Sequence, residues 1–244
     1  MHLPLSQNEI LGLVNRMDLA SLLLKRHIEE QIIELVNLSE EWHLNALKDF
    51  LSSEKISNTE LPEWLTRKGW ENQDLQTHIA REESLYRFSK QRFGPGIEER
   101  YLITAADLDD VIYSLIRVKD GLLARELWFR LSEGEISFVD AAAQYGQGPE
   151  ADRKGLIGPI PIGSIEPPAI RNLLRGLSPG EFTSPQLFGG LHLLLRLEQL
   201  NPSVLDDKMK RKLLREQLEA FLQERTQALL ANKDVEPLHY DPEP

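Results

Sequence analysis

Cysteine is absent from this chain of 244 residues. Disulfide bonds, thiolate metal ligands and cysteine nucleophiles are therefore excluded. Histidine is also scarce: six residues are scattered along the chain, and no two have the i, i+4 spacing that places both imidazoles on one helix face. No phosphate-binding loop and no Gly-x-Ser-x-Gly element is present. We therefore expect no metal centre and no cofactor.

Positive charge is in deficit, because 28 lysines and arginines face 39 aspartates and glutamates, for a net charge of -11. Such a chain is not expected to bind nucleic acid or anionic lipid, and a neutral or basic polypeptide is an easier partner. No apolar run approaches 18 residues, so no membrane insertion is expected. The opening MHLPLSQNEILGLVNRMD lacks the pattern of a signal peptide. We therefore expect a cytoplasmic, soluble protein.

Helical periodicity dominates the first hundred residues, up to the break at Gly94-Pro95-Gly96. Ser6 and Glu9 have the spacing of a capping box and predict the start of the first helix. After Asn201-Pro202 a long amphipathic helix follows, and its apolar stripe must be covered by another apolar surface. We expect this C-terminal helix to pack back on the N-terminal helices. Residues 233–244 are polar and rich in proline, which predicts a flexible tail.

Strand patterns occur only in the middle of the chain. Val111–Val118 reads VIYSLIRV and Leu191–Leu197 reads LHLLLRL, both β-branched or apolar runs of strand length. Two helix patterns and a glycine-punctuated loop lie between them. The chain is therefore expected to belong to the α+β class.

Several motifs in this middle region occur together in one order: VIYSLIRVKD, LARELWFRLSEGEISFVDAAAQYG, GLIGPIPIG, LSPGEFTSP and GGLHLLLRLE. Their order and spacing resemble the parvulin-type peptidyl-prolyl cis-trans isomerases over about Asp107–Gln199. With helices on both sides, the layout is similar to the chaperone-isomerases of the SurA and PrsA type. The resemblance implies a four-stranded antiparallel sheet flanked by helices.

The expected domain limits follow from the resemblance and the helix patterns. Residues 1–106 are expected to form a helical, chaperone-like domain, and residues 107–200 a parvulin-like isomerase domain. Residues 201–232 are expected to form the helix that completes the helical domain.

The resemblance also implies site residues. Ile157, Ile165 and Ile170 match the apolar cup that holds the proline ring of the substrate, here without an aromatic wall. His192 matches the second histidine of the family's paired-histidine centre. The first histidine position is occupied by Ser114, or by Leu115 if the gap falls differently, and we expect Ser114 and His192 to be the catalytic residues.

Three further positions bear on this expected site. The aspartate of the family's loop is replaced by Leu156, and the acidic or cysteine position after the second helix falls near Gly148. Glu150 and Asp152 are close enough in sequence to take that role. Strand alternation places Tyr113 on the face opposite to Ser114.

Two functions are compatible with these residues. The resemblance implies a peptidyl-prolyl isomerase that acts on Xaa-Pro bonds of unfolded, proline-containing polypeptides. The alternative is a peptide-binding chaperone, or an accessory factor for peptide maturation or export, that keeps the fold but has little or no isomerase activity.

Overall fold

The computed structural model describes residues 4–241, which form two compact units. The helical unit consists of residues 4–98 and 206–241, and the sheet unit of Glu99–Leu205. The predicted α+β class is confirmed, as is the four-stranded antiparallel sheet. Whether the limits predicted at residues 106 and 200 define independently folding pieces stays a prediction.

The helical unit begins with the predicted capping box. The Ser6 side chain accepts a hydrogen bond from the backbone N–H of Glu9, and the Glu9 carboxylate accepts one from the backbone N–H of Ser6. The elements of this unit are α1 (Gln7–Arg16), α2 (Ala20–Val36), α3 (Glu40–Glu54), α4 (Leu61–Lys68), α5 (Asn72–Phe93), the 3-10 turn η1 (Gly94–Gly96) and α10 (Asp207–Leu230).

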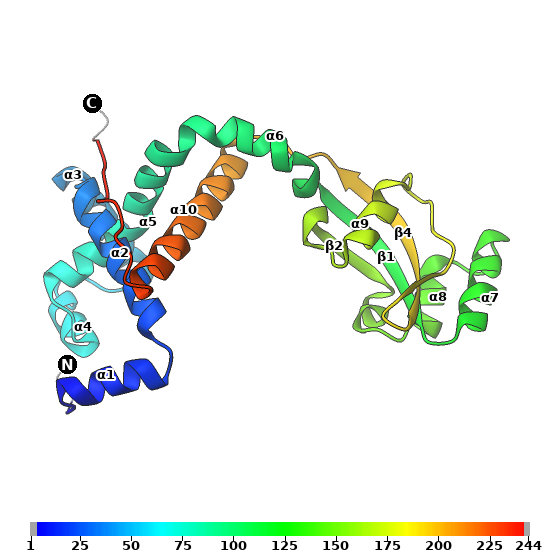
Figure 1. The fold of residues 1–244 in the computed structure, drawn as a ribbon, viewed down its shortest axis with the longest axis horizontal. Coiled ribbons are helices and arrows are strands. Elements are labelled where there is room, and N and C mark those ends of the chain that lie inside the picture. Colours follow the sequence, from blue (N-terminus) through cyan, green and yellow to red (C-terminus); the bar gives the residue numbers. More distant parts are fainter. Residues whose placement is uncertain (1–3, 242–244) are drawn as a thin grey trace. The chain divides into compact units, whose positions relative to one another are not determined.

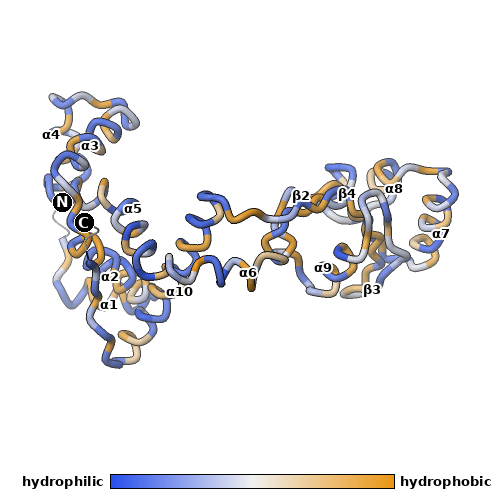
Figure 2. Tube along the Cα trace, turned by 90° about the horizontal axis from the view of Figure 1, so that it is seen from above, coloured by the Kyte–Doolittle hydropathy of each residue, from blue (hydrophilic) through white to orange (hydrophobic). Residues whose placement is uncertain are grey.

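The core of the helical unit lies between α2, α5 and α10 (Figure 1). Along α10 the colour alternates between hydrophilic and hydrophobic, as expected of an amphipathic helix (Figure 2). Leu218 and Leu222 of α10 are buried against Ile28, Ile32 and Phe88 of the other two helices. The prediction that the C-terminal helix packs back on the N-terminal helices is therefore confirmed.

The C-terminal tail has one defined arrangement over its described residues, and the expectation that residues 233–244 are flexible stays a prediction. Over residues 235–241 it follows the helical unit, and Leu238 and Tyr240 pack against the core that α10 completes. In Figure 1 this red segment runs beside the helices of the same unit. In this arrangement, side chains of the helical unit form hydrogen bonds with the main chain of Glu236 and Asp241. Residues 242–244 lie outside the described part of the chain.

The sheet unit is built around two long central strands. Its elements are α6 (Ile97–Leu108, of which Ile97 and Glu98 belong to the helical unit), β1 (Asp110–Val118), α7 (Gly121–Ser132), α8 (Phe138–Tyr145), the 3-10 turns η2 (Pro149–Arg153) and η3 (Ile162–Ser164), β2 (Leu156–Pro161), α9 (Pro168–Arg175), β3 (Gln186–Phe188) and β4 (Leu191–Asn201). The strand order is β2-β1-β4-β3 and every pair is antiparallel.

Each face of the sheet is covered by different helices. On the α9 face, the side chains of β1 and β4 pack against Ile170 and Leu174 of α9. On the α8 face, Ile116, Val118 and Leu194 pack against α7 and α8. Because both strands are buried on both sides, they read as nearly continuous apolar runs.

Candidate functional site

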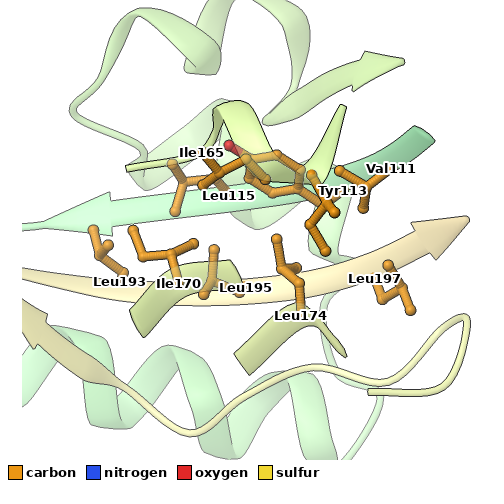
Figure 3. Packing of buried hydrophobic residues seen from close by; sticks show 10 residues of the cluster. Val111, Tyr113, Leu115, Ile165, Ile170, Leu174, Leu193, Leu195 and Leu197 are labelled. Carbon is orange, nitrogen blue, oxygen red and sulfur yellow. The ribbon is translucent and has the colours of Figure 1, made fainter. Parts of the chain in front are cut away.

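The α9 face collects the three isoleucines that the sequence analysis selected. Ile157 lies on β2 opposite Tyr113 of β1, Ile165 follows η3, and Ile170 lies on α9. Ile165 and Ile170 are buried in one cluster, and Ile157 is partly buried against it. The structure thus brings together residues from three separate elements. The cluster has ten buried members, of which Figure 3 labels all but Ile162: Val111, Tyr113, Leu115, Ile165, Ile170, Leu174, Leu193, Leu195 and Leu197.

Two aromatic residues belong to this cluster, so the sequence-based picture of a cup without an aromatic wall is wrong. Phe188 of β3 is partly buried against the cluster, and Tyr113 is buried within it. The expectation that Tyr113 lies on the face opposite to Ser114 is correct. However, the face that carries the isoleucines is that of Tyr113, which places its phenol in the candidate site (Figure 3).

The phenol of Tyr113 is the polar group of this cluster. No group in residues 4–241 forms a hydrogen bond with its hydroxyl. Burial raises the pKa of Tyr113 above its ordinary value, while nearby Arg117 lowers that pKa and nearby Glu150 raises it. The phenol therefore stays protonated at neutral pH and is available as a hydrogen-bond donor.

Glu150 is buried, with 7% of its surface exposed, and it accepts a hydrogen bond of 2.6 Å from Nε of Arg117. A buried carboxylate is stable only when such a partner compensates for its lost hydration. The pair lies close to Gly148: a Cβ atom at that position would be 2.5 Å from Nε of Arg117, so a larger residue there would require the pair to move. Of the two acidic residues considered for this loop, Glu150 is therefore the one placed beside the α9 face, while Asp152 is exposed.

Ser114 lies on the α8 face. It is directly opposite Arg196 of β4, whose guanidinium lies 5.9 Å from the ring centroid of Phe138. The Ser114 hydroxyl donates a hydrogen bond of 2.5 Å to Glu198, and Glu198 forms an ion pair of 3.1 Å with Arg196. These three side chains form one connected polar group within the fold, in which Nε of Arg196 is buried without a hydrogen bond among the described residues.

His192 also lies on the α8 face, at its far end. It pairs with Val118, four residues along β4 from the position opposite Ser114, which is about 13 Å at the rise of a strand. Its ring rests against the start of α7: a Cβ atom added to Gly121 would lie 2.8 Å from Nε2 of His192. His192 therefore contributes to the contact between β4 and α7.

The catalytic role expected of Ser114 and His192 stays a prediction, and this geometry does not support it. Ser114 and His192 are on the side of the sheet that faces away from the isoleucines, and they are too far apart to act on one amide. The α9 face instead has Leu115 and Leu193 at its centre, both buried. Strand alternation correctly predicted that Tyr113 and Ser114 lie on opposite faces of the sheet. The positions of the three isoleucines then showed that the candidate site lies on the face of Tyr113.

Metal binding receives no support from the geometry. Within the described residues no three histidine, aspartate or glutamate side chains are grouped so as to hold a metal ion. Among those same residues, no helix combines the length and apolar character needed to cross a membrane.

Comparison with known proteins was informative only at the level of structure. No protein-family profile and no curated protein sequence matches this chain. The peptidylprolyl isomerase PrsA from Bacillus anthracis is similar in structure, with a TM-score of 0.50 and 19% identity over 88% of this chain and 100% of that chain. This chain therefore has the PrsA fold.

Two further solved structures are similar over all or part of the chain. A PpiC-type peptidyl-prolyl cis-trans isomerase domain is 18% identical over 41% of this chain and 99% of its own, with a TM-score of 0.36. A SurA-like chaperone of Campylobacter jejuni is 14% identical over 82% of this chain and 88% of its own, with a TM-score of 0.37.

The expected cytoplasmic location is wrong in view of these similarities. The structure that the chain resembles over 88% of its length is that of PrsA, a protein that acts outside the cytoplasm. The expectation depended on the absence of a recognisable export signal in the printed sequence, and an absence of this kind is weak evidence.

Proposed function

We propose that this chain is a parvulin-like peptidyl-prolyl cis-trans isomerase and foldase that acts on Xaa-Pro bonds of unfolded polypeptides. The observation that carries the proposal is the α9 face, where Ile157, Ile165 and Ile170 meet beside the hydroxyl of Tyr113. The shared PrsA fold supports it. In this proposal the three isoleucines bind the proline ring, and Tyr113 replaces Ser114 and His192 as the polar group that contacts the substrate.

The chemistry required of such a site is modest. Rotation about an Xaa-Pro amide has a barrier of about 18–20 kcal/mol, because resonance gives the C–N bond partial double-bond character. An apolar surface that removes water from the amide favours the twisted transition state, which has lost that resonance and its charge separation. A phenol that donates a hydrogen bond to the amide nitrogen, whose lone pair is no longer delocalised in the twisted state, adds to this preference. No covalent bond is broken and no titrating group is needed.

A second function is favoured by a specific observation. His192 is the sole histidine of the sheet unit and it packs on α7, so the α9 face has no imidazole. An apolar cluster of aliphatic residues with Tyr113 and Phe188 is also suited to holding a peptide without accelerating its isomerisation. The alternative is therefore a peptide-binding chaperone or accessory factor for peptide maturation or export.

One pair of measurements separates these functions. The rate of cis-trans exchange is measured by NMR on a panel of Xaa-Pro tetrapeptides, with and without the protein, and aggregation of an unfolded protein is measured in parallel. The proposal expects faster exchange for at least one peptide. No acceleration for any peptide, together with suppressed aggregation, would replace it with the chaperone function.

A further inference from the structure

The C-terminal segment lies on the helical unit in the manner of a bound peptide. Between residues 237 and 241 its exposure alternates: Leu238 and Tyr240 are partly buried, and Pro237, His239 and Asp241 are exposed. Alternation with a period of two is the pattern of an extended chain with one side against a surface. That surface is the core cluster of the helical unit, to which α2, α5 and α10 contribute buried residues such as Ile28, Phe88 and Leu222.

The hydrogen bonds that hold this segment go to its main chain. The side-chain amide of Gln91 accepts a hydrogen bond of 3.0 Å from the N–H of Asp241 and donates one to the carbonyl of the same residue. Nη1 of Arg225 donates a hydrogen bond of 2.7 Å to the carbonyl of Glu236. Because every residue except proline offers the same N–H and C=O groups, this mode of binding does not depend on the sequence of the segment.

The apolar side chains of the segment meet a surface that is prepared for them. The rings of Phe93 and Phe221 lie 6.0 Å apart, and the Arg92 guanidinium lies 4.6 Å from the Phe221 centroid. The two rings meet edge to face at an interplanar angle of 63°, and they pack against the same core cluster as Leu238 and Tyr240. The surface therefore has two features of a general peptide site, which are an apolar bed and side chains that hold a backbone.

We propose that residues 235–241 are the internal occupant of a peptide-binding site on the helical unit. The ligand that binds this site in trans is an extended polypeptide segment with two apolar side chains two residues apart, and it displaces the tail. The site itself is argued from the contacts of the tail, whereas the identity of the trans ligand as a segment of an unfolded client rests on the proposed function. Because the tail is tethered, it competes with a polypeptide in trans at an effective concentration of the order of millimolar. The affinity for that polypeptide is therefore low while the tail occupies the site.

The test uses a fluorescent peptide with the sequence of residues 234–241, DVEPLHYD. Its binding is measured by anisotropy to the full chain and to a chain that ends at Lys233, which retains all of α10. We expect the shortened chain to bind this peptide at least tenfold more tightly than the full chain. A peptide carrying L238S and Y240S should not bind. Equal binding to both chains, or none to a shortened chain that still melts cooperatively, overturns the proposal.

A second pair of variants keeps the tail in place and covers the case in which the shortened chain does not fold. In the full-length protein, L238S/Y240S and Gln91→Ala should both increase peptide binding. The matched control is Gln76→Ala, which changes an exposed glutamine on the same helix fifteen residues earlier, about 22 Å away along the axis. Folded tail variants that bind the peptide no better than the control contradict the proposal.

Isomerase measurements on the same variants keep the two proposals separable. If the peptide binds as expected but no variant accelerates Xaa-Pro exchange, the peptide site stands and the isomerase function fails. If exchange is accelerated but the peptide binds none of the folded variants, the peptide site fails and the isomerase function stands.

Discussion

The two faces of the central sheet use the same two strands, but their polar groups differ in what they bind. On the α8 face, Ser114, Arg196 and Glu198 are paired with one another. On the α9 face, the hydroxyl of Tyr113 has no hydrogen bond within residues 4–241. The Ser114 hydroxyl and the Glu198 carboxylate are thus engaged by their own chain, although Nε of Arg196 beside them is buried without a partner among the described residues. The hydroxyl of Tyr113 has no such partner and is available to a ligand.

The comparison also shows why residue types that are common in catalysis are a poor guide to the position of the candidate site in this protein. Histidine and serine are the residue types most often associated with catalysis, and both lie on the α8 face, while the α9 face has aliphatic residues at its centre. For amide rotation, an apolar environment is more useful than a titrating group. The following predictions test this division of roles, from the largest expected effect to the smallest.

If both faces of the sheet are covered by elements of the sheet unit itself, this unit should fold without the helical unit, whereas the N-terminal helices should not fold without α10. Removal of residues 206–244 takes away α10, whose Leu218 and Leu222 are buried against α2 and α5. Each buried leucine is worth about 1.5–3 kcal/mol, which is a large share of the roughly 5–15 kcal/mol that stabilises a domain. We expect residues 4–98 alone to aggregate and residues 99–205 alone to melt cooperatively. Size-exclusion chromatography and thermal circular dichroism check this, and a monomeric, folded 4–98 fragment would contradict it.

A matched pair of substitutions tests the division of roles most directly. Ile170 on the α9 face and Leu131 on the α8 face are equally buried, at 8% and 9% exposure. Replacing either by alanine leaves a cavity that costs about 2–5 kcal/mol of unfolding free energy. We expect Ile170→Ala to lower the rate of Xaa-Pro exchange at least tenfold and Leu131→Ala to leave it within about twofold. Rates are compared well below both melting temperatures; equal loss in the two variants would remove the assignment of the pocket.

The buried ion pair beside the site is tested by Glu150→Gln, which keeps the shape of the side chain but removes its charge. Since Arg117 is partly exposed, we expect a loss of only about 1–3 kcal/mol in unfolding free energy. The pKa of Tyr113 should fall, because Glu150 raises it in the wild-type protein. Asp152→Asn in the same loop is the control and should change neither quantity. Urea unfolding and ultraviolet titration of tyrosine measure the two effects.

Tyr113→Phe removes the free hydroxyl and leaves the ring in place. A lost hydrogen bond to the substrate of about 0.5–1.5 kcal/mol predicts a decrease of roughly twofold to tenfold in the exchange rate at pH 7. Ile157→Val, which changes the same cluster without a polar group, serves for comparison. An unchanged rate in the phenylalanine variant would show that the hydroxyl does not contact the substrate.

The same substitution has a predicted pH signature. Burial raises the pKa of Tyr113 in the folded state above the value of about 10 in the unfolded chain. The stability contributed by the neutral phenol is therefore complete below about pH 10 and is lost as the pH rises through the folded-state pKa. Tyr113→Phe should lose less stability than the wild type across this alkaline range. Chemical unfolding at a series of pH values checks the sign, with Tyr86→Phe as the control.

The smallest effect on exchange is expected for His192→Ala. The ring packs against Gly121 on the α8 face, so its removal should weaken the contact of β4 with α7 and reduce stability by about 1–3 kcal/mol. The exchange rate of the folded variant should remain within about twofold of wild type. A tenfold loss of rate without a change in melting temperature would restore His192 as a catalytic residue.

Much of the fold was predictable because its signals are local. The capping box at Ser6 and Glu9, the apolar stripe of α10 and the strand runs of β1 and β4 depend on residues close in sequence. The three isoleucines could also be found, since the loop and helix that carry them have recognisable motifs. The tail was not predictable in the same way. Leu238 and Tyr240 are its two apolar residues in contact with the core, and their i, i+2 spacing has no visible purpose in the sequence. It fits a surface that α2, α5 and α10 form only in the folded structure.

The sequence by itself determined that this chain is α+β, that its C-terminal helix covers its N-terminal helices, and which apolar residues gather on one side of the sheet. The tertiary structure decided on which side each polar candidate lies. The reason is the period of two in a strand: a one-residue change of register sends every side chain to the other face. A register shift in the pairing of β1 with β4 occurs between Ile112 and Tyr113. This shift leaves Glu198 of β4 as the extra residue, while the alternation along β1 stays regular, with Val111, Tyr113 and Leu115 all in the α9-face cluster. The packing of α9 and of the isoleucines decided which of the two faces carries the candidate site.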